Sequence, residues 1–475
     1  MRNGAFAVTL AAAVALGGCI AVDEVEGRRL GLPDYDGIFK CDSSDVSTLD
    51  DGQEDVAHEG PWSWEELAVR AGKRSDASKV AYIDAAVRRL RAEEELTWKD
   101  PELRFGQGWG DSRSRASGDP QANGGDYSTS VGVRFYVPNP FVERYIRAKR
   151  DGEIRKEDAR AAVEAYEVYS EVKMLCYEEA RARADERYLE ERAKAWDDLR
   201  KASDESYRNG VFISPLDAIR AETKFQKAKI KLDTMASARE TLRRRIAWLT
   251  GIPDDRLVID SEPPPMPDPA SLSVERLTEI AFARRPDLAA AVAELDEAEA
   301  GVKAAKAARI PWFRFVEATY SHDNDRMSEW DRHKTGHSDE FSVKASIYLP
   351  IFTWAGESVE LSEMVQARAN ARLMALYSSI RQEITTAYND YFDACSRVKE
   401  KESRQFVERM EKRIREYSSC SAAMAEETCK ANEELIDYKN VQDIARMLRV
   451  EAALRLEAVV GGPLPLPADY AKIQD

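Results

Sequence analysis

The segments "KDPELRF" (residues 99–105) and "RIPWFRF" (residues 309–315) decide the fold of this sequence. In both, a Pro follows a long stretch of helical character, and an Arg and a Phe come three and four residues after that Pro. Pro cannot continue a helix, so each segment marks the end of a helix and the start of a different element. Similar segments roughly 210 residues apart predict two tandem copies of one unit.

Other residues match at nearly the same offset: Leu67 with Leu277, Tyr136 with Tyr348, Pro138 with Pro350, Tyr207 with Tyr417, and Gly251 with Gly461. We therefore predict a first repeat over residues 61–260 and a second over residues 273–465, joined by a Pro-rich linker at residues 261–272. A signal peptide (residues 1–18) and a leader (residues 19–60) precede the repeats. A tail (residues 466–475) follows them.

The composition excludes several classes of protein. The chain has 475 residues, of which 33% are charged, and its formal net charge is −16. This charge argues against nucleic acid as a partner. After residue 20 no stretch approaches the ~18 consecutive apolar residues of a membrane-spanning helix. If the protein enters a membrane, it has to do so with strands.

The N-terminus predicts export. Arg2 precedes an apolar run from Ala5 to Leu16, which has the length of a signal-peptide core. "LGGC" (Leu16–Cys19) resembles the bacterial lipobox, which implies acylation of Cys19 and attachment to lipid. The alternative is a plain signal peptide with an incidental Cys. Ile20, at the position where Asp would resemble an inner-membrane retention signal, favours the outer membrane.

Two segments have the alternation of strands that face lipid on one side and water on the other. In "SVGVRFYVP" (residues 130–138) and "FSVKASIYLP" (residues 341–350), apolar residues alternate with polar ones. Arg134, Tyr136, Lys344 and Tyr348 fall on the polar side. Period-two alternation over roughly ten residues suits a tilted membrane strand. Two half-buried strands of a soluble sheet are the alternative.

Each repeat offers two strands, so the chain has four. Four strands cannot close a barrel, since small barrels need about eight or more. An open edge in hydrocarbon would leave backbone amides unpaired at several kcal/mol each. A membrane location therefore predicts a dimer with eight strands or a trimer with twelve.

Long helices follow the strands. Residues 142–207 would span about 100 Å as one helix, and a second long helix is predicted to end at Tyr417. The helical segment before the first strand is predicted to run from Trp64 to about Trp98. A soluble coiled coil is the alternative for long charged helices, but it would not have a pair of strands before each long helix.

Three segments resemble the TolC-like outer-membrane efflux proteins: residues 284–313 ("RRPDLAAAVAELDEAEAGVKAAKAARIPWF"), "LPIFTWAGE" (residues 349–357) and "YRNGVFISPLDAIRAE" (residues 207–222). The resemblance implies a mainly α fold with a small β part, in which long antiparallel α-hairpins form a hollow cylinder below four membrane strands per chain. It also implies a homotrimer with a twelve-stranded β-barrel in the outer membrane and a long periplasmic part.

The same resemblance implies passive conduction of small molecules that an inner-membrane pump delivers through a periplasmic adaptor protein. Lipidation resembles the small-molecule branch of the family more than the branch that secretes proteins, and a type I protein-secretion channel stays an alternative. A lipid-anchored periplasmic coiled-coil scaffold without a pore is a second alternative. We expect no enzymatic activity and no cofactor, because no catalytic or phosphate-binding motif is present.

The sequence departs from the family in two places. "KRSDAS" (residues 73–78) stands where the second repeat has "RRPDLA". Cys420 replaces the usual Gly of the second hairpin tip, and "CSAAMAEETC" begins there.

Candidate site residues follow from the resemblance at the two hairpin tips. Glu434 and Asp437, three apart on one helix face, would form an acidic ring that constricts the pore, with Asp217 as their weaker counterpart. Arg208, Gly210 and Val211 would contact the adaptor. The alternatives are solvated carboxylates and simple turn residues.

The cysteines and histidines give two further predictions. Cys420 and Cys429 are close in sequence and flank a polar turn, so they are predicted to form a disulfide. Three histidines, His322, His333 and His337, are predicted to lie in a solvated loop near Asp323 and Asp331, with no metal bound.

Overall fold

The computed structural model describes residues 38–39, 60–94, 99–111, 125–208, 215–325, 336–349, 357–398, 400–418 and 425–465. Cys19, Gly210, Val211, His333 and Cys420 lie outside these ranges. Within them the chain forms two compact units. A strand unit contains Arg89–Arg155 and Val292–Arg372, and a helical unit contains Leu30–Arg88, Lys156–Ala291 and Leu373–Asp475.

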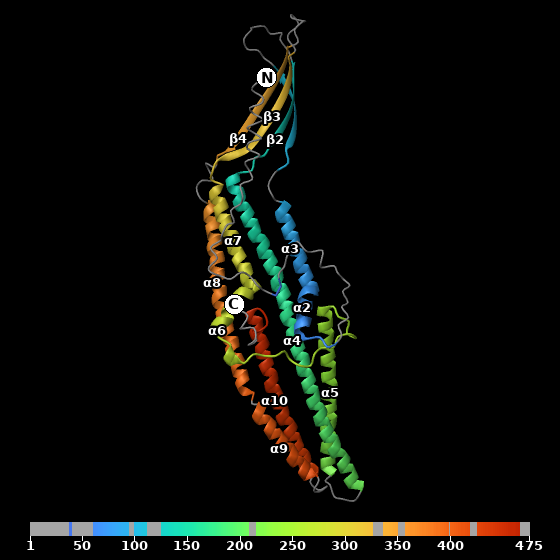
Figure 1. The fold of residues 1–475 in the computed structure, drawn as a ribbon. Helices are drawn as coiled ribbons and strands as arrows, with labels where there is room; N and C mark the ends of the chain where they lie inside the picture. The colour runs from blue at the N-terminus through green and yellow to red at the C-terminus, as the bar shows by residue number, and fades with distance from the viewer. Residues whose placement is uncertain are drawn as a thin grey trace. The chain divides into compact units, whose positions relative to one another are not determined.

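The strand unit contains one antiparallel sheet of four strands in the order β1-β2-β3-β4 (Figure 1). The strands are β1 (Glu102–Asp111), β2 (Gly125–Phe135), β3 (Trp312–Asp325) and β4 (Gly336–Tyr348). Each predicted strand is present. The sheet has two outer strands, β1 and β4, which come from different halves of the chain.

The strands continue beyond the predicted segments: β2 begins at Gly125 and β4 at Gly336, whereas the predicted segments begin at residues 130 and 341. Gly106 and Gly108 belong to β1 and pair with Ser130 and Ser128 of β2. A Cβ at either glycine would lie 2.5 Å from the hydroxyl oxygen of the paired Ser. Glycine here allows close cross-strand contact and does not mark a turn. His322 was also expected in a loop, but it is a residue of β3 that pairs with Asp339 on β4.

Helices precede and follow each strand pair in the same order. They are α2 (Trp64–Arg74), α3 (Asp76–Glu94), α4 (Pro140–Arg208), α5 (Pro215–Thr250), α6 (Val274–Arg284), α7 (Pro286–Ala307), α8 (Glu357–Arg397), α9 (Glu400–Ser418) and α10 (Ala425–Val460). A 3₁₀ turn, η2 (Pro269–Ser271), lies in the linker. The long helix α4 is unbroken over 69 residues and contains the whole segment predicted as one helix, residues 142–207. The tandem duplication itself stays a prediction.

Two predicted helices are interrupted. The second long helix ends as α8 at Arg397 and resumes as α9 at Glu400. No Pro or Gly marks this position. The Ser396 hydroxyl donates to the carbonyl of Asp393, and the amide of Val398 donates to the carbonyl of Cys395, so bonds to residues three earlier replace the regular helical ladder.

The second interruption separates α2 from α3 at Ser75, in the segment where the first repeat lacks the Pro of the second. Ser75 is extended, with φ −61° and ψ 147°, and its amide bonds to the carbonyl of Ala71. Arg285, between α6 and α7, has the same arrangement, with an amide bond to Ala281. The helix break therefore persists in "KRSDAS" although the Pro that would enforce it is missing.

The core of the helical unit forms around the middle of α4. Val172 and Cys176 are fully buried there against Leu67 of α2, Ile246 of α5 and Leu454 of α10. Burial raises the pKa of the Cys176 thiol to about 12, so this thiol is chemically inert near neutral pH. Among the described residues, no helix is both long and apolar enough to cross a membrane.

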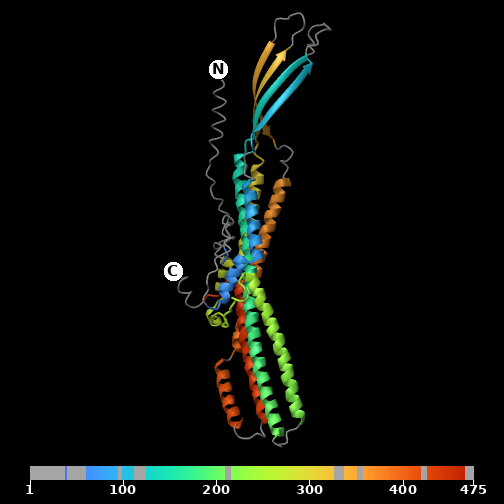
Figure 2. The ribbon, with the colours of Figure 1, turned by 90° about the vertical axis from the view of Figure 1, so that its right-hand side faces the viewer.

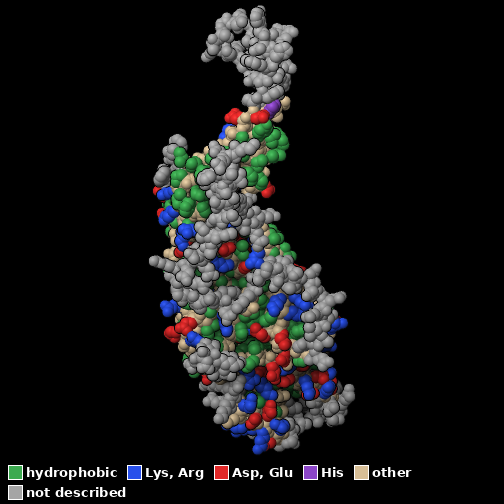
Figure 3. Space-filling model, turned by 45° about the horizontal axis from the view of Figure 1, so that its top comes forward, with side chains coloured by type: hydrophobic (Ala, Val, Ile, Leu, Met, Phe, Trp, Pro, Cys, Tyr) green, Lys and Arg blue, Asp and Glu red, His purple; other side chains and the backbone are tan. Residues whose placement is uncertain are grey.

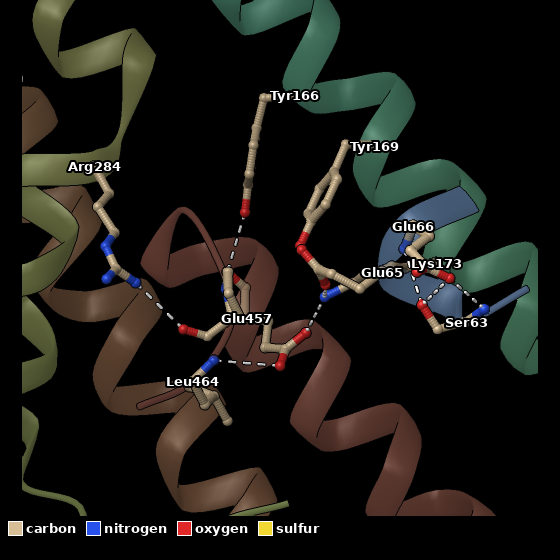
Figure 4. Close-up of polar contacts among 10 residues, drawn as sticks. Ser63, Glu65, Glu66, Tyr166, Tyr169, Lys173, Arg284, Glu457 and Leu464 are labelled. Carbon is tan, nitrogen blue, oxygen red and sulfur yellow. Dashed lines mark hydrogen bonds and ion pairs between the residues drawn. The ribbon is translucent and has the colours of Figure 1, made fainter. Parts of the chain in front are cut away.

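Buried polar contacts hold α2 and α10 to α4 in this core (Figure 4). The Lys173 ammonium lies 2.5 Å from a carboxylate oxygen of Glu65 and 2.9 Å from one of Glu457. The Tyr169 hydroxyl donates to Glu65 at 2.8 Å, and the Tyr166 hydroxyl donates to the carbonyl of Glu457 at 3.1 Å. Burial raises the pKa of both tyrosines, which keeps them as neutral donors.

Candidate functional site

One face of the sheet carries exposed apolar side chains on every strand. The register places Leu103, Phe105, Val131, Val133, Phe135, Val316, Ala318, Tyr320, Phe341 and Val343 on this face. Phe105 is 75% exposed and Phe341 is 68% exposed. Figure 3 shows hydrophobic side chains gathered on the strands. Large apolar groups exposed side by side over four strands are typical of a surface that faces lipid or a partner.

The opposite face is polar. Glu102, Arg134, Glu317 and Lys344 lie directly opposite one another across β1, β2, β3 and β4. A bulge between Phe313 and Phe315 shifts the register of β3 near its start. This shift brings Phe313 opposite Ile347 and Phe315 opposite Ser346.

Glu317 is the centre of the polar face. Its Oε2 accepts hydrogen bonds from Arg134 at 2.5 and 2.6 Å and from Arg104 at 3.4 Å. The Arg134 guanidinium also lies 4.0 Å from the centre of the Phe315 ring. Glu317 is only 8% exposed, so a single carboxylate is almost enclosed by its cationic neighbours. Arg134 and Lys344 were among the residues predicted for this face, whereas Arg104 and Glu317 were not.

The other predicted residues of this face lie at its edge. Tyr136 follows the last residue of β2, and its hydroxyl donates to Glu102 at 2.7 Å. Tyr348 is the last residue of β4 and is 52% exposed. On the apolar face, Nδ1 of His322 lies 2.6 Å from Asp339. No group of three metal-binding side chains occurs in the part of the chain that the structure describes.

In the helical unit, a second polar cluster links α4 to α10 and α5. The Tyr188 hydroxyl donates to Asp437 at 2.7 Å, and Arg192 donates to the Tyr188 oxygen at 2.7 Å and to Glu433 at 2.5 Å. Lys224 of α5 lies 3.3 Å from the same Glu433. Burial and the hydrogen bond to Asp437 raise the pKa of Tyr188. We call these five residues the helix-end network.

The structure brings one of the predicted acidic gate residues, Asp437, into this network. Glu434 is exposed. Its neighbour Glu433, which was not among the predicted residues, binds Arg192 of α4. Asp217 is a residue of α5, and Arg208 is the last residue of α4. Glu433 and Asp437 are four residues apart on α10, and Tyr188 and Arg192 are four residues apart on α4. A pair of acceptors and a pair of donors with the same spacing was the sequence pattern that could have identified the network.

Cys429 packs beside the helix-end network. Its side chain is buried with Trp196, Leu199 and Ala221, and its thiol donates to the carbonyl of Ala195 at 3.4 Å. Lys224 lies 3.8 Å from the centre of the Trp196 ring. The partner of the predicted disulfide, Cys420, lies outside the described residues, so that disulfide stays a prediction.

The comparisons with known proteins agree with this geometry. Residues 277–400 match the family model described as outer membrane efflux protein. The fold is that of outer-membrane efflux channels. The resemblance to TolC-like efflux proteins is therefore confirmed, although no curated protein sequence matches the chain.

Three solved structures illustrate the similarity. The outer membrane protein VceC of Vibrio cholerae is 16% identical, with a TM-score of 0.60, and the match covers 85% of this chain and 97% of that one. The CmeC outer membrane channel of Campylobacter jejuni is 14% identical, with a TM-score of 0.61 and coverage of 86% and 88%. CusC, described as forming a transmembrane channel, is 14% identical, with a TM-score of 0.61 and coverage of 91% and 99%.

Proposed function

We propose that this chain is the outer-membrane channel of a tripartite efflux system, and that it passively conducts small molecules from an inner-membrane pump and its periplasmic adaptor. The observation that carries the proposal is the two-faced sheet. An apolar face on every strand, opposite a polar face with Arg134 and Glu317, suits a wall between lipid and a water-filled pore. A scaffold without a pore needs no such sheet.

The two outer strands support assembly from several copies. β1 and β4 have no further partner strand in the described sheet. In hydrocarbon their unpaired amides would cost several kcal/mol each, so the sheet has to close with strands of other copies. The trimer with twelve strands is the arrangement that the family resemblance favours, with Arg134, Tyr136, Lys344 and Tyr348 facing the pore.

In the helical unit we propose a gate that includes Glu434, Asp437 and, less strongly, Asp217. The hydrogen bond that Asp437 accepts from Tyr188 of α4 supports it, because a gate has to be held closed by contacts that can be broken. We further propose that Arg208, Gly210 and Val211 contact the adaptor, that Cys19 carries the lipid anchor in the outer membrane, and that Cys420 and Cys429 form a disulfide.

Planar-bilayer conductance of the purified protein tests the main proposal. We expect stepwise conductance from a species that requires detergent for extraction and elutes as an oligomer. A monomer that leaves membranes without detergent and conducts nothing would contradict the channel and favour the coiled-coil scaffold. Transport of an unfolded polypeptide instead of small molecules would favour the secretion branch.

A further inference from the structure

The charged residues on the polar face of the sheet bear on which solutes can pass. One row of cross-strand partners contains Arg134, Glu317 and Lys344. The next row on the same face contains Arg104. Glu102 completes the first row on β1. Of these five charged residues three are cationic and two are anionic, so each copy of the chain contributes a positive excess to this level of the sheet.

The two carboxylates of this group are engaged by neighbours. Glu317 is nearly buried and accepts its shortest bonds from Arg134, and Glu102 accepts the Tyr136 hydroxyl. The exposed cations, Arg104 and Lys344, have weaker contacts with carboxylates or none among the described residues. Arg104 has a half-exposed side chain that reaches Glu317 only at 3.4 Å. Lys344 is exposed and forms no ion pair with any residue that the structure describes.

A further described carboxylate on this face lies too far away to cancel the excess. Glu340 pairs with Ser321, four residues along β4 from Lys344. Four residues of a strand span about 13 Å, which exceeds the Debye length of about 8 Å at physiological ionic strength. The positive excess at Arg104 and Lys344 is therefore a local property of the surface.

We propose that Arg104 and Lys344, supported by the Arg134–Glu317 pair, form a cationic band in the pore wall that favours solutes carrying an anionic group such as a carboxylate, sulfonate or phosphate. Rings of Lys and Arg favour anions in pores, because low-dielectric walls focus their field. Arg in addition matches planar anions with paired donors. Symmetric copies of the chain would repeat the band around the pore. The inference rests on the proposed channel function.

Reversal potentials in a KCl gradient across planar bilayers test the band. Lys344→Glu and Arg104→Glu are expected to lower the chloride-to-potassium permeability ratio, and Glu317→Gln to raise it. Each change is expected to be about two- to tenfold, as follows from a change of one to two kT in the local potential. Lys344→Gln, which removes the charge without adding a carboxylate, has to shift the ratio in the same direction as Lys344→Glu by a smaller factor.

Asp339→Asn is the matched control. It removes one negative charge from the same sheet as Glu317→Gln does, but from the apolar face, so the permeability ratio is expected to stay unchanged. Equal shifts for Asp339→Asn and Glu317→Gln would overturn the inference, as would unchanged ratios in conducting channels of all the variants. Absence of conductance in the unsubstituted protein would contradict the channel function itself. Elution as the same oligomer confirms that each variant is folded.

Discussion

The chain has two long helical arms, one formed by α4 and the other by α8 and α9. Different kinds of contact hold the two arms. α4 is unbroken and buries Lys173 and Cys176 in the middle of the core, where α2, α5 and α10 meet it. The second arm is interrupted between α8 and α9, and α9 lies beside α10 (Figures 1 and 2). There it contacts α10 through Phe406 and Glu411, both on partly exposed surfaces.

This difference indicates how each arm can move. Breaking a buried ion pair leaves an uncompensated charge and costs several kcal/mol, whereas an exposed pair contributes at most about 1 kcal/mol. Segments with few buried contacts open locally at the lowest free energy. We therefore expect α4 to remain fixed and α9 to be the part of the two arms that detaches most readily.

The largest effect is expected for Lys173→Ala. This change leaves Glu457, whose side chain is 14% exposed, without its cation, and should lower the free energy of unfolding by about 3–5 kcal/mol in denaturant titrations. Lys439→Ala removes the matched exposed bridge to Glu411 and should cost less than about 1 kcal/mol. Equal costs for the two variants would refute the distinction between the arms.

Arg192→Ala should have the next largest effect. It removes the donor to Glu433 and Tyr188 and should cost about 1–3 kcal/mol, since it leaves a partly buried carboxylate with fewer partners. Because Arg192 links α4 to α10, we also expect a higher open probability in bilayers. Tyr188→Phe removes the bonds of the Tyr188 hydroxyl to Asp437 and Arg192 but keeps the Arg192–Glu433 bridge, and it should act in the same direction more weakly. If the variants are destabilised but their open probability is unchanged, the helix-end network has a structural role and no role in gating.

Phe406→Ala should have a smaller and local effect. The Phe406 ring lies 4.8 Å from that of Tyr438, and such aromatic pairs contribute about 0.5–1.5 kcal/mol beyond the area they bury. Hydrogen exchange should accelerate at the amides of α9 and not at those around Val172 of α4. Acceleration spread evenly over both arms would show that α9 does not open independently.

The smallest effect concerns pH. The hydrogen bond from Lys439 lowers the pKa of Glu411. An unfolded Glu has a pKa of about 4.3, so the bridge stabilises the protein fully above that pH and loses its effect as pH falls through the lower folded value. The difference in the free energy of unfolding between wild type and Lys439→Gln should be below about 1 kcal/mol at pH 7 and vanish in acid. A difference that persists at pH 3 would contradict this origin.

The sequence was sufficient to predict the strands and most helix ends, because both depend on nearby residues. Alternation in residues 130–138 marks a strand locally, and α5 ends at Thr250, directly before Gly251, which has φ +66°. The break after Arg397 could not be predicted, since no Pro or Gly accompanies it.

The site residues were harder to predict, because they depend on partners distant in sequence. Arg134 and Glu317 meet only through the register of β2 with β3, which no local pattern reveals. The helix-end network likewise joins Arg192 to Glu433, and in a chain with 33% charged residues many such pairs are conceivable. Charged side chains of both signs are interspersed over the helices in Figure 3, which illustrates this ambiguity.

The exposed apolar face of the sheet also has a consequence for biogenesis. The helical unit has its own buried core, so it does not need lipid or another copy of the chain to fold. In the proposed channel, the exposed Phe105 and Phe341 and the two outer strands of the sheet would be covered only by lipid and by other copies of the chain. For the proposed channel we therefore expect an intermediate with folded helices and a chaperone-bound sheet, so that membrane insertion and not helix formation limits the rate of maturation.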